Sequence, residues 1–145
     1  MSHPVGFWQT WFLGMARHVA TASKDPSTKV GAVVADEQRR VCGVGYNGFA
    51  RKVNDHPARL ENREVKYKYV VHAEVNAILN SRGGSDGCTI YCTLHPCSSC
   101  ASFIVQAGIT KVVCPPQTIE RWAEDAKIAA EILTEGGVKL LLVNE

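Results

Sequence analysis

Two short segments of the sequence carry residue types that bind metals and move protons. The first is His72-Ala73-Glu74, and the second is Pro96-Cys97-Ser98-Ser99-Cys100. One neutral imidazole and two thiolates supply three zinc ligands and leave the fourth tetrahedral position for water, whereas a four-ligand structural site would leave no place for a reactant. The two segments together therefore predict a catalytic zinc site formed by His72, Cys97 and Cys100.

Glu74 is the candidate proton carrier of this site. It lies two residues from His72, and a carboxylate near a zinc-bound water can remove a proton from that water and pass it to a substrate. The alternative is an exposed carboxylate in the first turn of a helix, where it would only complement the helix dipole. We favour the proton-transfer role because the metal-binding pattern lies beside it.

The remaining cysteines are better interpreted as buried thiols than as disulfides. The first residues do not have the pattern of a secretion signal, so we expect a protein that is not secreted, and disulfide frameworks are typical of secreted proteins. A second metal site at Cys88 and Cys92 would lack a third ligand. The predicted free thiols are Cys42, Cys88, Cys92 and Cys114.

Hydrophobic periodicity and turn residues predict the elements that position these side chains. Helices are expected over residues 7–22, 59–66, 71–80, 97–106 and 119–134, and strands over 29–35, 40–45, 88–94, 111–114 and 138–143. The first two strands follow closely enough to form an antiparallel hairpin. Strands and helices then alternate, which predicts parallel neighbours joined by right-handed crossovers. We expect an α/β fold with three layers, α/β/α, around a mixed five-stranded sheet.

Both metal-binding segments then begin a helix. A helix N-terminus favours the thiolate form of a cysteine there, and Pro96 suits the entrance to such a helix. The aromatic residues near the start of the sequence are predicted to form the buried side of the first helix. They are Phe7, Trp8, Trp11 and Phe12.

Size and composition predict one domain over residues 1–145, without repeats or linkers. The net charge is only +2, and from Arg51 to Lys68 basic and acidic residues are mixed. That mixture indicates a solvated surface, so nucleic acid is not an expected partner. No apolar run approaches the roughly 20 residues that cross a bilayer, so we expect a cytoplasmic protein without a membrane partner.

Four segments carry a resemblance to a known family: residues 23–32 (SKDPSTKVGA), 45–49 (GYNGF), 71–78 (VHAEVNAI) and 93–101 (TLHPCSSCA). The pattern H-x-E with P-C-x-x-C is typical of zinc-dependent nucleobase deaminases. With the first two segments, the sequence resembles the deoxycytidylate (dCMP) deaminase family of the cytidine deaminase superfamily. The resemblance implies a cytidine deaminase-like fold. It also implies hydrolysis of dCMP, or of a 5-substituted relative, to dUMP and ammonia, which would supply thymidylate synthesis.

The resemblance also implies roles for individual residues. His72, Cys97 and Cys100 would bind Zn²⁺, with Glu74 as the proton shuttle. Asn47 would hold a sugar hydroxyl, although an Asn-Gly pair is also typical of a turn. The backbone N–H of Ala73 would contact the pyrimidine carbonyl. The candidates for phosphate binding, which could equally be loop or surface residues, are Ser23, Lys24 and Lys29.

Partners of the family are expected too: a homo-oligomer, often a hexamer, with dCTP and dTTP as effectors and Mg²⁺ accompanying the regulatory nucleotide. Three alternatives stay open. The base could be guanine, or the adenosine of a transfer RNA, although an RNA editor needs a basic, aromatic surface. The chain could also be a non-catalytic module that uses zinc for folding only.

Overall fold

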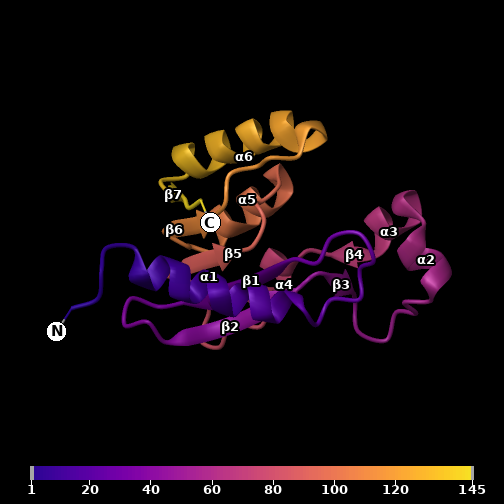
Figure 1. The fold of residues 1–145 in the computed structure, drawn as a ribbon, viewed down its shortest axis with the longest axis horizontal. Helices are drawn as coiled ribbons and strands as arrows, with labels where there is room; N and C mark the ends of the chain where they lie inside the picture. The colour runs from indigo at the N-terminus through magenta and orange to yellow at the C-terminus, as the bar shows by residue number, and fades with distance from the viewer. Residues whose placement is uncertain (1, 145) are drawn as a thin grey trace.

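The computed structural model describes residues 2–144, and its centre is a five-stranded sheet in the order β2-β1-β5-β6-β7 (Figure 1). The strands are β1 (Gly31–Ala35), β2 (Val41–Tyr46), β5 (Thr89–Cys92), β6 (Lys111–Cys114) and β7 (Lys139–Leu142). Strand β1 pairs antiparallel with both β2 and β5, whereas β6 runs parallel to β5 and β7. The sheet is therefore mixed, as expected, with an antiparallel half and a parallel half.

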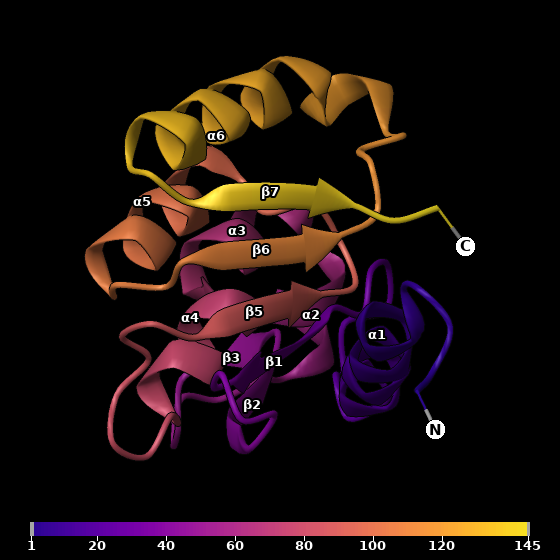
Figure 2. The same cartoon turned by 90° about the vertical axis from the view of Figure 1, so that its left-hand side faces the viewer.

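Helices cover both faces of this sheet, which confirms the three-layer prediction (Figure 2). On one face lies α1 (Phe7–Ala20), and on the other lie α4 (Ala73–Leu79), α5 (Ser98–Gln106) and α6 (Ala123–Glu135). Successive strand residues point to opposite faces. Thus Val33 packs in the cluster of α1, whereas Val34 packs with the residues of α4, α5 and α6.

The apolar side of α1 is rotated slightly from the predicted one. Phe12 is fully buried and stacks on Tyr91 of β5, with 4.7 Å between the ring centroids. Trp11 is 46% exposed, so its predicted burial is wrong. It precedes Phe12 by one residue, and a one-residue step turns a side chain about 100° around a helix, away from the sheet.

The segment between β2 and α4 contains more structure than expected. Instead of one short helix over 59–66, it forms α2 (Pro57–Glu61) and α3 (Arg63–Tyr69). Asn62 separates them, because its backbone is extended and its side chain accepts a hydrogen bond from the Val65 N–H as the N-cap of α3. A small antiparallel sheet of β3 (Gly48–Phe49) and β4 (Val70–Val71), which the sequence did not predict, closes the segment.

Lys66 corrects the interpretation of this segment as a solvated surface. Its side chain is 7% exposed, because its ammonium group pairs with the Asp25 carboxylate at 3.0 Å. Asp25 lies 41 residues earlier in the chain. The mixture of charges along this segment therefore gave no sign that one of its lysines forms a buried ion pair with a distant aspartate.

Helix α4 lies unusually close to β2 because two glycines leave room for it. A Cβ atom at Gly45 would lie 2.6 Å from the Ala73 carbonyl oxygen, and one at Gly43 would lie 2.7 Å from the Ala77 carbonyl oxygen. The side-chain amide of Asn76 then donates to the Tyr46 carbonyl at 2.9 Å. These contacts fix the height and register of the helix that begins after His72.

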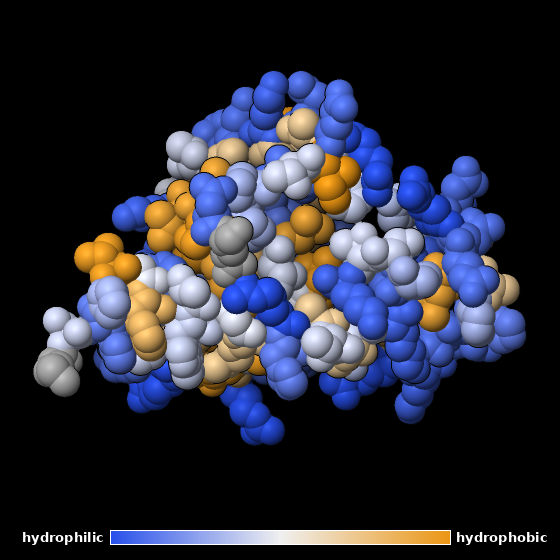
Figure 3. Space-filling model, in the orientation of Figure 1, coloured by the Kyte–Doolittle hydropathy of each residue, from blue (hydrophilic) through white to orange (hydrophobic). Residues whose placement is uncertain are grey.

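The final helix begins as a short 3-10 turn, Glu120–Trp122, before α6 proper, and this replaces the uninterrupted helix expected over 119–134. Hydrophilic side chains cover the outer face of α6, and apolar ones gather below it (Figure 3). Within residues 2–144, no helix is long and apolar enough to cross a membrane.

Candidate metal centre and its cavity

Two helix N-termini bring three metal-binding side chains to one point. His72 is the N-cap residue of α4, Cys97 is that of α5, and Cys100 lies in the first turn of α5. The His72 Nδ1 atom is 3.2 Å from the Cys100 Sγ atom and 3.6 Å from the Cys97 Sγ atom. All three donor atoms lie within 4.8 Å of one another. The structure thus brings together the three residues that the sequence singled out.

The spacing of these donors fits a zinc ion. Tetrahedral zinc with Zn–N near 2.0–2.1 Å and Zn–S near 2.3 Å separates a nitrogen from a sulfur ligand by about 3.5 Å. The observed separations of 3.2 and 3.6 Å bracket that value. Across residues 2–144, no other group of three or more His, Cys, Asp or Glu side chains has metal-binding spacing. Three ligands also leave one coordination position for a reactant.

The site favours a thiolate before any metal is considered. A hydrogen bond from the Cys100 thiol, helped by the His72 imidazole, lowers the pKa of Cys97 to about 4 although the residue is half-buried. The same Cys97–Cys100 contact, together with burial, raises the pKa of Cys100. Hydrogen bonding to Cys97 raises the pKa of His72. Cys97 is therefore an ionised ligand at neutral pH, and metal binding must displace a proton from Cys100.

Glu74 lies beside these ligands and is 5% exposed. Burial raises the pKa of its carboxyl group, although the neighbouring His72 opposes the shift. An exposed first-turn carboxylate, the alternative considered for this residue, does not describe a side chain buried in this way. A buried carboxyl group with a raised pKa holds a proton more readily than an exposed carboxylate does, which suits a group that accepts and returns protons.

Helix α5 is held in place by a residue of α6. The Asp125 carboxylate accepts hydrogen bonds from the Ser98 backbone N–H at 2.8 Å and from the Ser98 hydroxyl at 2.6 Å. Ser98 is the first residue of α5 and lies between the two cysteines. This contact satisfies an N–H group that has no partner inside the helix, and it fixes the turn that carries the thiols.

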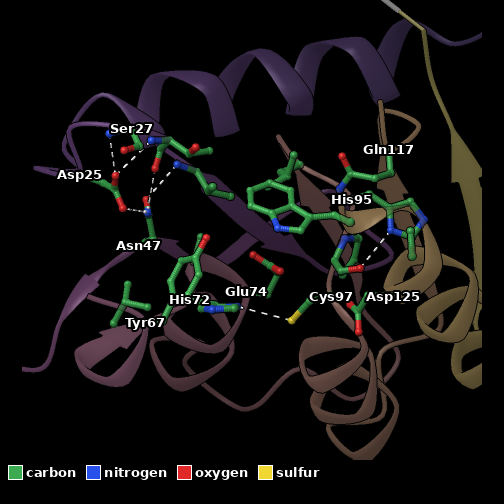
Figure 4. A pocket seen from close by; sticks show the side chains of 18 of the residues that line it. Asp25, Ser27, Asn47, Tyr67, His72, Glu74, His95, Cys97, Gln117 and Asp125 are labelled. Atoms are coloured by element: carbon green, nitrogen blue, oxygen red, sulfur yellow. Dashed lines mark hydrogen bonds between the residues drawn. The ribbon is translucent and has the colours of Figure 1, made fainter. Parts of the chain in front are cut away.

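The metal centre opens into a cavity of about 340 Å³, a usual size for a small-molecule site. Ala73 and Glu74 line it beside the metal-binding side chains, and the apolar side chains of Leu94, Pro96 and Trp122 line the walls. In Figure 4, Asp25 and Asn47 lie on one side of Glu74 and Asp125 lies on the other. The cavity therefore has two distinct ends with the metal donors between them.

Asn47 lines this cavity, and its side-chain amide already forms hydrogen bonds with other protein groups. Its side-chain oxygen accepts a hydrogen bond from the Val30 N–H at 2.8 Å. Its side-chain nitrogen donates to the Thr28 carbonyl at 2.9 Å and approaches Asp25 at 3.4 Å. The side-chain oxygen has a second lone pair, which can accept a hydrogen bond from a ligand hydroxyl. Asn47 therefore also anchors the loop that precedes β1.

The three residues that the resemblance suggested for phosphate binding lie outside the cavity of the metal centre. Ser23 is buried, and its hydroxyl donates to the Asn47 carbonyl at 2.9 Å. Lys24 pairs with Asp55 at 2.8 Å and lines a smaller neighbouring cavity. Lys29 is exposed. None of the three lines the cavity of the metal centre.

The cavity is also lined by residues that the metal-binding motifs do not include. The cationic ones are Arg63, Lys66 and Arg121. Arg63 and Lys66 are three residues apart within the helix predicted over 59–66, so that prediction already placed them on one face. Arg121 lies over the ring of its neighbour Trp122, 4.6 Å from the centroid. His95 is buried and lines the cavity, and its Nδ1 atom is 3.0 Å from the Pro96 carbonyl oxygen.

Comparison with known proteins agrees with this geometry. Residues 7–115 match the family model described as cytidine and deoxycytidylate deaminase zinc-binding region. A protein of Aliivibrio fischeri, named an uncharacterized deaminase in the luxG 3' region, is 42% identical over 136 residues, which cover 92% of this chain and 91% of that protein.

Mouse deoxycytidylate deaminase is 42% identical over 112 residues, which cover 73% of this chain. This chain spans only 63% of the length of the mouse enzyme. Among solved structures, the dCMP deaminase of the cyanophage S-TIM5, in complex with dCMP and dUMP, superposes with a TM-score of 0.76. That match has 23% identity and covers 97% of this chain and 100% of the phage chain, which shows a shared fold.

Proposed function

The chain belongs to the family of the cytidine and deoxycytidylate deaminase zinc-binding region, and we propose that it hydrolyses dCMP, or a 5-substituted dCMP, to dUMP and ammonia. The observation that carries the proposal is the buried Glu74 carboxyl group beside three donors with zinc spacing, at the wall of a cavity that Glu74, His72 and Cys97 line. The product would supply thymidylate synthesis in the cytoplasm. Residues 1–145 would act as one deaminase domain.

In this proposal His72, Cys97 and Cys100 hold the zinc ion. When bound, zinc acts as a Lewis acid that makes water a stronger nucleophile near neutral pH. The water oxygen adds to the ring carbon that carries the amine, and the bond from that carbon to the amine nitrogen breaks. One water oxygen enters and one ammonia leaves, so the ring keeps its size and gains a carbonyl.

Glu74 moves the protons of this reaction. It accepts one proton from the attacking water and passes it to the ring nitrogen, and it then takes the second proton from the new hydroxyl group on the ring carbon and gives it to the departing amine. Ala73 orients the base: as the first residue of α4, its N–H has no partner within the helix and can donate to the pyrimidine carbonyl. Asn47 would accept a hydrogen bond from a sugar hydroxyl through the free lone pair of its oxygen.

A substrate panel tests the proposal. Zinc-loaded protein is assayed by ultraviolet absorbance with dCMP, CMP, dCTP, deoxycytidine, 5-methyl-dCMP and guanine, and separately with transfer RNA. The expected result is the highest kcat/KM for dCMP or 5-methyl-dCMP. Turnover of guanine alone would show a different deaminase, and salt-dependent binding with turnover of transfer RNA would show an RNA editor. Stoichiometric zinc without turnover of any of these substrates would indicate a non-catalytic module.

We also propose that the protein works as a homo-oligomer, with a hexamer expected, and responds to dCTP and dTTP with Mg²⁺. Large apolar side chains on the outside support self-association: Leu79 is 74% exposed on α4, and Phe103 is 53% exposed on α5. Light scattering with and without each nucleotide and Mg²⁺ measures the oligomer and its response. A monomer under all conditions would remove this part of the proposal.

A further inference from the structure

Strand β2 lies at one edge of the five-stranded sheet, and two side-chain amides of α4 and its C-cap bind the backbone of that strand. Asn76 donates to the Tyr46 carbonyl, and Asn80 donates to the Val44 carbonyl, each at 2.9 Å. Residues four apart lie on the same face of a helix. The helix is therefore tied to the edge strand at two points, one helical turn apart.

Asn76 makes the contact that is nearer to the metal centre. Its backbone N–H donates to the His72 carbonyl at 3.0 Å, which closes the first turn of α4. Its side-chain nitrogen holds the Tyr46 carbonyl. The two backbones meet here, since a Cβ atom at Gly45 would lie 2.7 Å from the carbonyl carbon of Asn76. Asn76 thus joins the turn that follows a metal donor to the end of β2.

The carbonyl that Asn76 holds belongs to the peptide unit that leads into Asn47. The N–H of the same unit donates to the Val30 carbonyl at 3.2 Å, so both polar groups of this unit are bonded. The side chain of Asn47 lines the cavity of the metal centre, as do His72 and Glu74. The hydrogen bond from Asn76 is therefore a direct link between two parts of the cavity wall that come from different elements.

We infer that Asn76 is a positioning residue, which fixes the separation between Asn47 at the sugar and the turn that carries His72 and Glu74. This inference rests on the proposed function. The sugar of dCMP has one free hydroxyl group, at its 3' position, so that group is the one that Asn47 would bind. Groups that act on one substrate must keep a matched separation, and a displacement of about 1 Å can cost about 10²-fold in rate. Asn80 makes a similar contact farther along the helix and has no such role.

Asn76→Ala and Asn80→Ala form a matched pair, because each removes one amide donor to the backbone of β2. Alanine is the best helix former, so both variants should fold. The measured quantity is the ratio of kcat/KM for dCMP to kcat/KM for 2',3'-dideoxy-CMP, which lacks the 3' hydroxyl group, in zinc-loaded protein. The ratio should fall about tenfold in Asn76→Ala, as expected when the hydrogen bond to that hydroxyl is lost. In Asn80→Ala it should equal the wild-type ratio.

Two further measurements separate positioning from a general loss of stability. Asn76→Gln keeps an amide donor on a longer side chain, so its ratio should lie between those of Asn76→Ala and the wild type. Calorimetric binding of dUMP and of 2',3'-dideoxy-UMP provides a readout without turnover, and the preference for dUMP should fall in Asn76→Ala alone. Urea unfolding of all variants shows whether the midpoints of Asn76→Ala and Asn80→Ala shift by similar amounts.

Four results would contradict different parts of this account. Equal falls of the ratio in Asn76→Ala and Asn80→Ala would assign Asn76 a structural role and overturn the inference. A wild-type ratio in Asn76→Ala would do the same. Equal turnover of dCMP and 2',3'-dideoxy-CMP by the wild type would remove the sugar contact of Asn47, and the inference with it, but would leave deamination in place. No turnover of any cytosine nucleotide by the wild type would instead remove the proposed function itself.

Discussion

The Asp125 carboxylate of α6 binds both the backbone N–H and the hydroxyl of Ser98, at 2.8 and 2.6 Å, at the start of α5. These residues lie 27 positions apart. One side chain thereby connects the last helix to the turn that carries Cys97 and Cys100. The zinc ligands depend on a residue that no metal motif includes.

Substitution Asp125→Ala should lower the free energy of unfolding by about 1–2 kcal/mol, because it removes the capping interaction of α5. It should also weaken zinc binding about 10- to 100-fold, as loss of a group that supports metal ligands usually does. Urea unfolding and chelator competition measure the two effects. Glu124→Ala is the control: Glu124 is exposed and pairs with Lys127 at 3.3 Å on the surface, so stability should barely change. Equal effects of both substitutions would contradict the assigned role.

Replacement of Glu74 by Gln should reduce kcat for dCMP by about 10²- to 10⁴-fold, because the amide cannot carry a proton. Zinc content should remain at one ion per chain, since Glu74 is outside the set of three donors. Elemental analysis and steady-state kinetics on the same preparation test this. Glu64→Gln, an exposed carboxylate change on α3, provides the comparison. Wild-type turnover in the Glu74 variant would refute its role in proton transfer.

Gly45→Ala should destabilise the protein by roughly 1–3 kcal/mol, since the added Cβ meets the backbone of α4 and the helix must move. The movement should also displace His72 and reduce zinc occupancy. Gly48→Ala is a matched change in the same segment, where the nearest atom to a new Cβ is a Tyr46 ring carbon at 3.9 Å. Thermal unfolding and zinc content compare the two. If Gly48→Ala lowers the free energy of unfolding as much as Gly45→Ala does, the close approach of α4 does not explain the requirement for glycine at position 45.

Stability at acidic pH should depend on Asp25. Burial opposes ionisation of its carboxyl group, but hydrogen bonds from Thr28, Ser27 and Lys66 lower its pKa below the ordinary 3.8. Its contribution is therefore complete above the unfolded-state pKa near 3.8 and disappears as the pH falls through the lower folded-state pKa. Unfolding free energies between pH 5 and about pH 2.5 should decline less steeply in Asp25→Asn than in the wild type. Parallel curves would show that Asp25 is not responsible.

Removal of zinc should make Cys97 the most reactive thiol of the folded protein. Its pKa of about 4 keeps it ionised at pH 7, whereas burial raises the pKa of Cys114 to about 12. Brief alkylation of the metal-free protein, followed by mass mapping, should label Cys97 first. Zinc should protect it. Labelling of Cys97 at the same rate with and without zinc would argue against its being a ligand.

Much of the fold could be predicted because its signals are local. The periodicity over β1, β2, β5, α5 and β6 placed these elements within about two residues, and the two metal segments were expected at helix N-termini. Side-chain chemistry alone then indicated that His72 and the two cysteines should meet. Each of these conclusions needs only neighbouring residues and general packing rules.

The parts that sequence reasoning missed depend on distant partners. Lys66 is buried because its ammonium group pairs with the Asp25 carboxylate, and the sequence around either residue does not identify the other as its partner. Asn62 divides one expected helix into two because its side chain, in an extended backbone, caps the second. Trp11 is exposed because the neighbouring Phe12 takes the place against Tyr91. In every case the choice between two locally acceptable structures is made by tertiary contacts.

The metal donors come from two helices with different main packing partners. Helix α4 packs on β1 and β2 in the antiparallel half, whereas α5 packs chiefly on α6 and meets α4 along one side. A bound ion is thus a cross-link between two structural halves, and the free energy of binding it adds to that of folding. The zinc content of a purified sample therefore reports whether α4 and α5 have both packed in their native positions, and it does so without a catalytic assay.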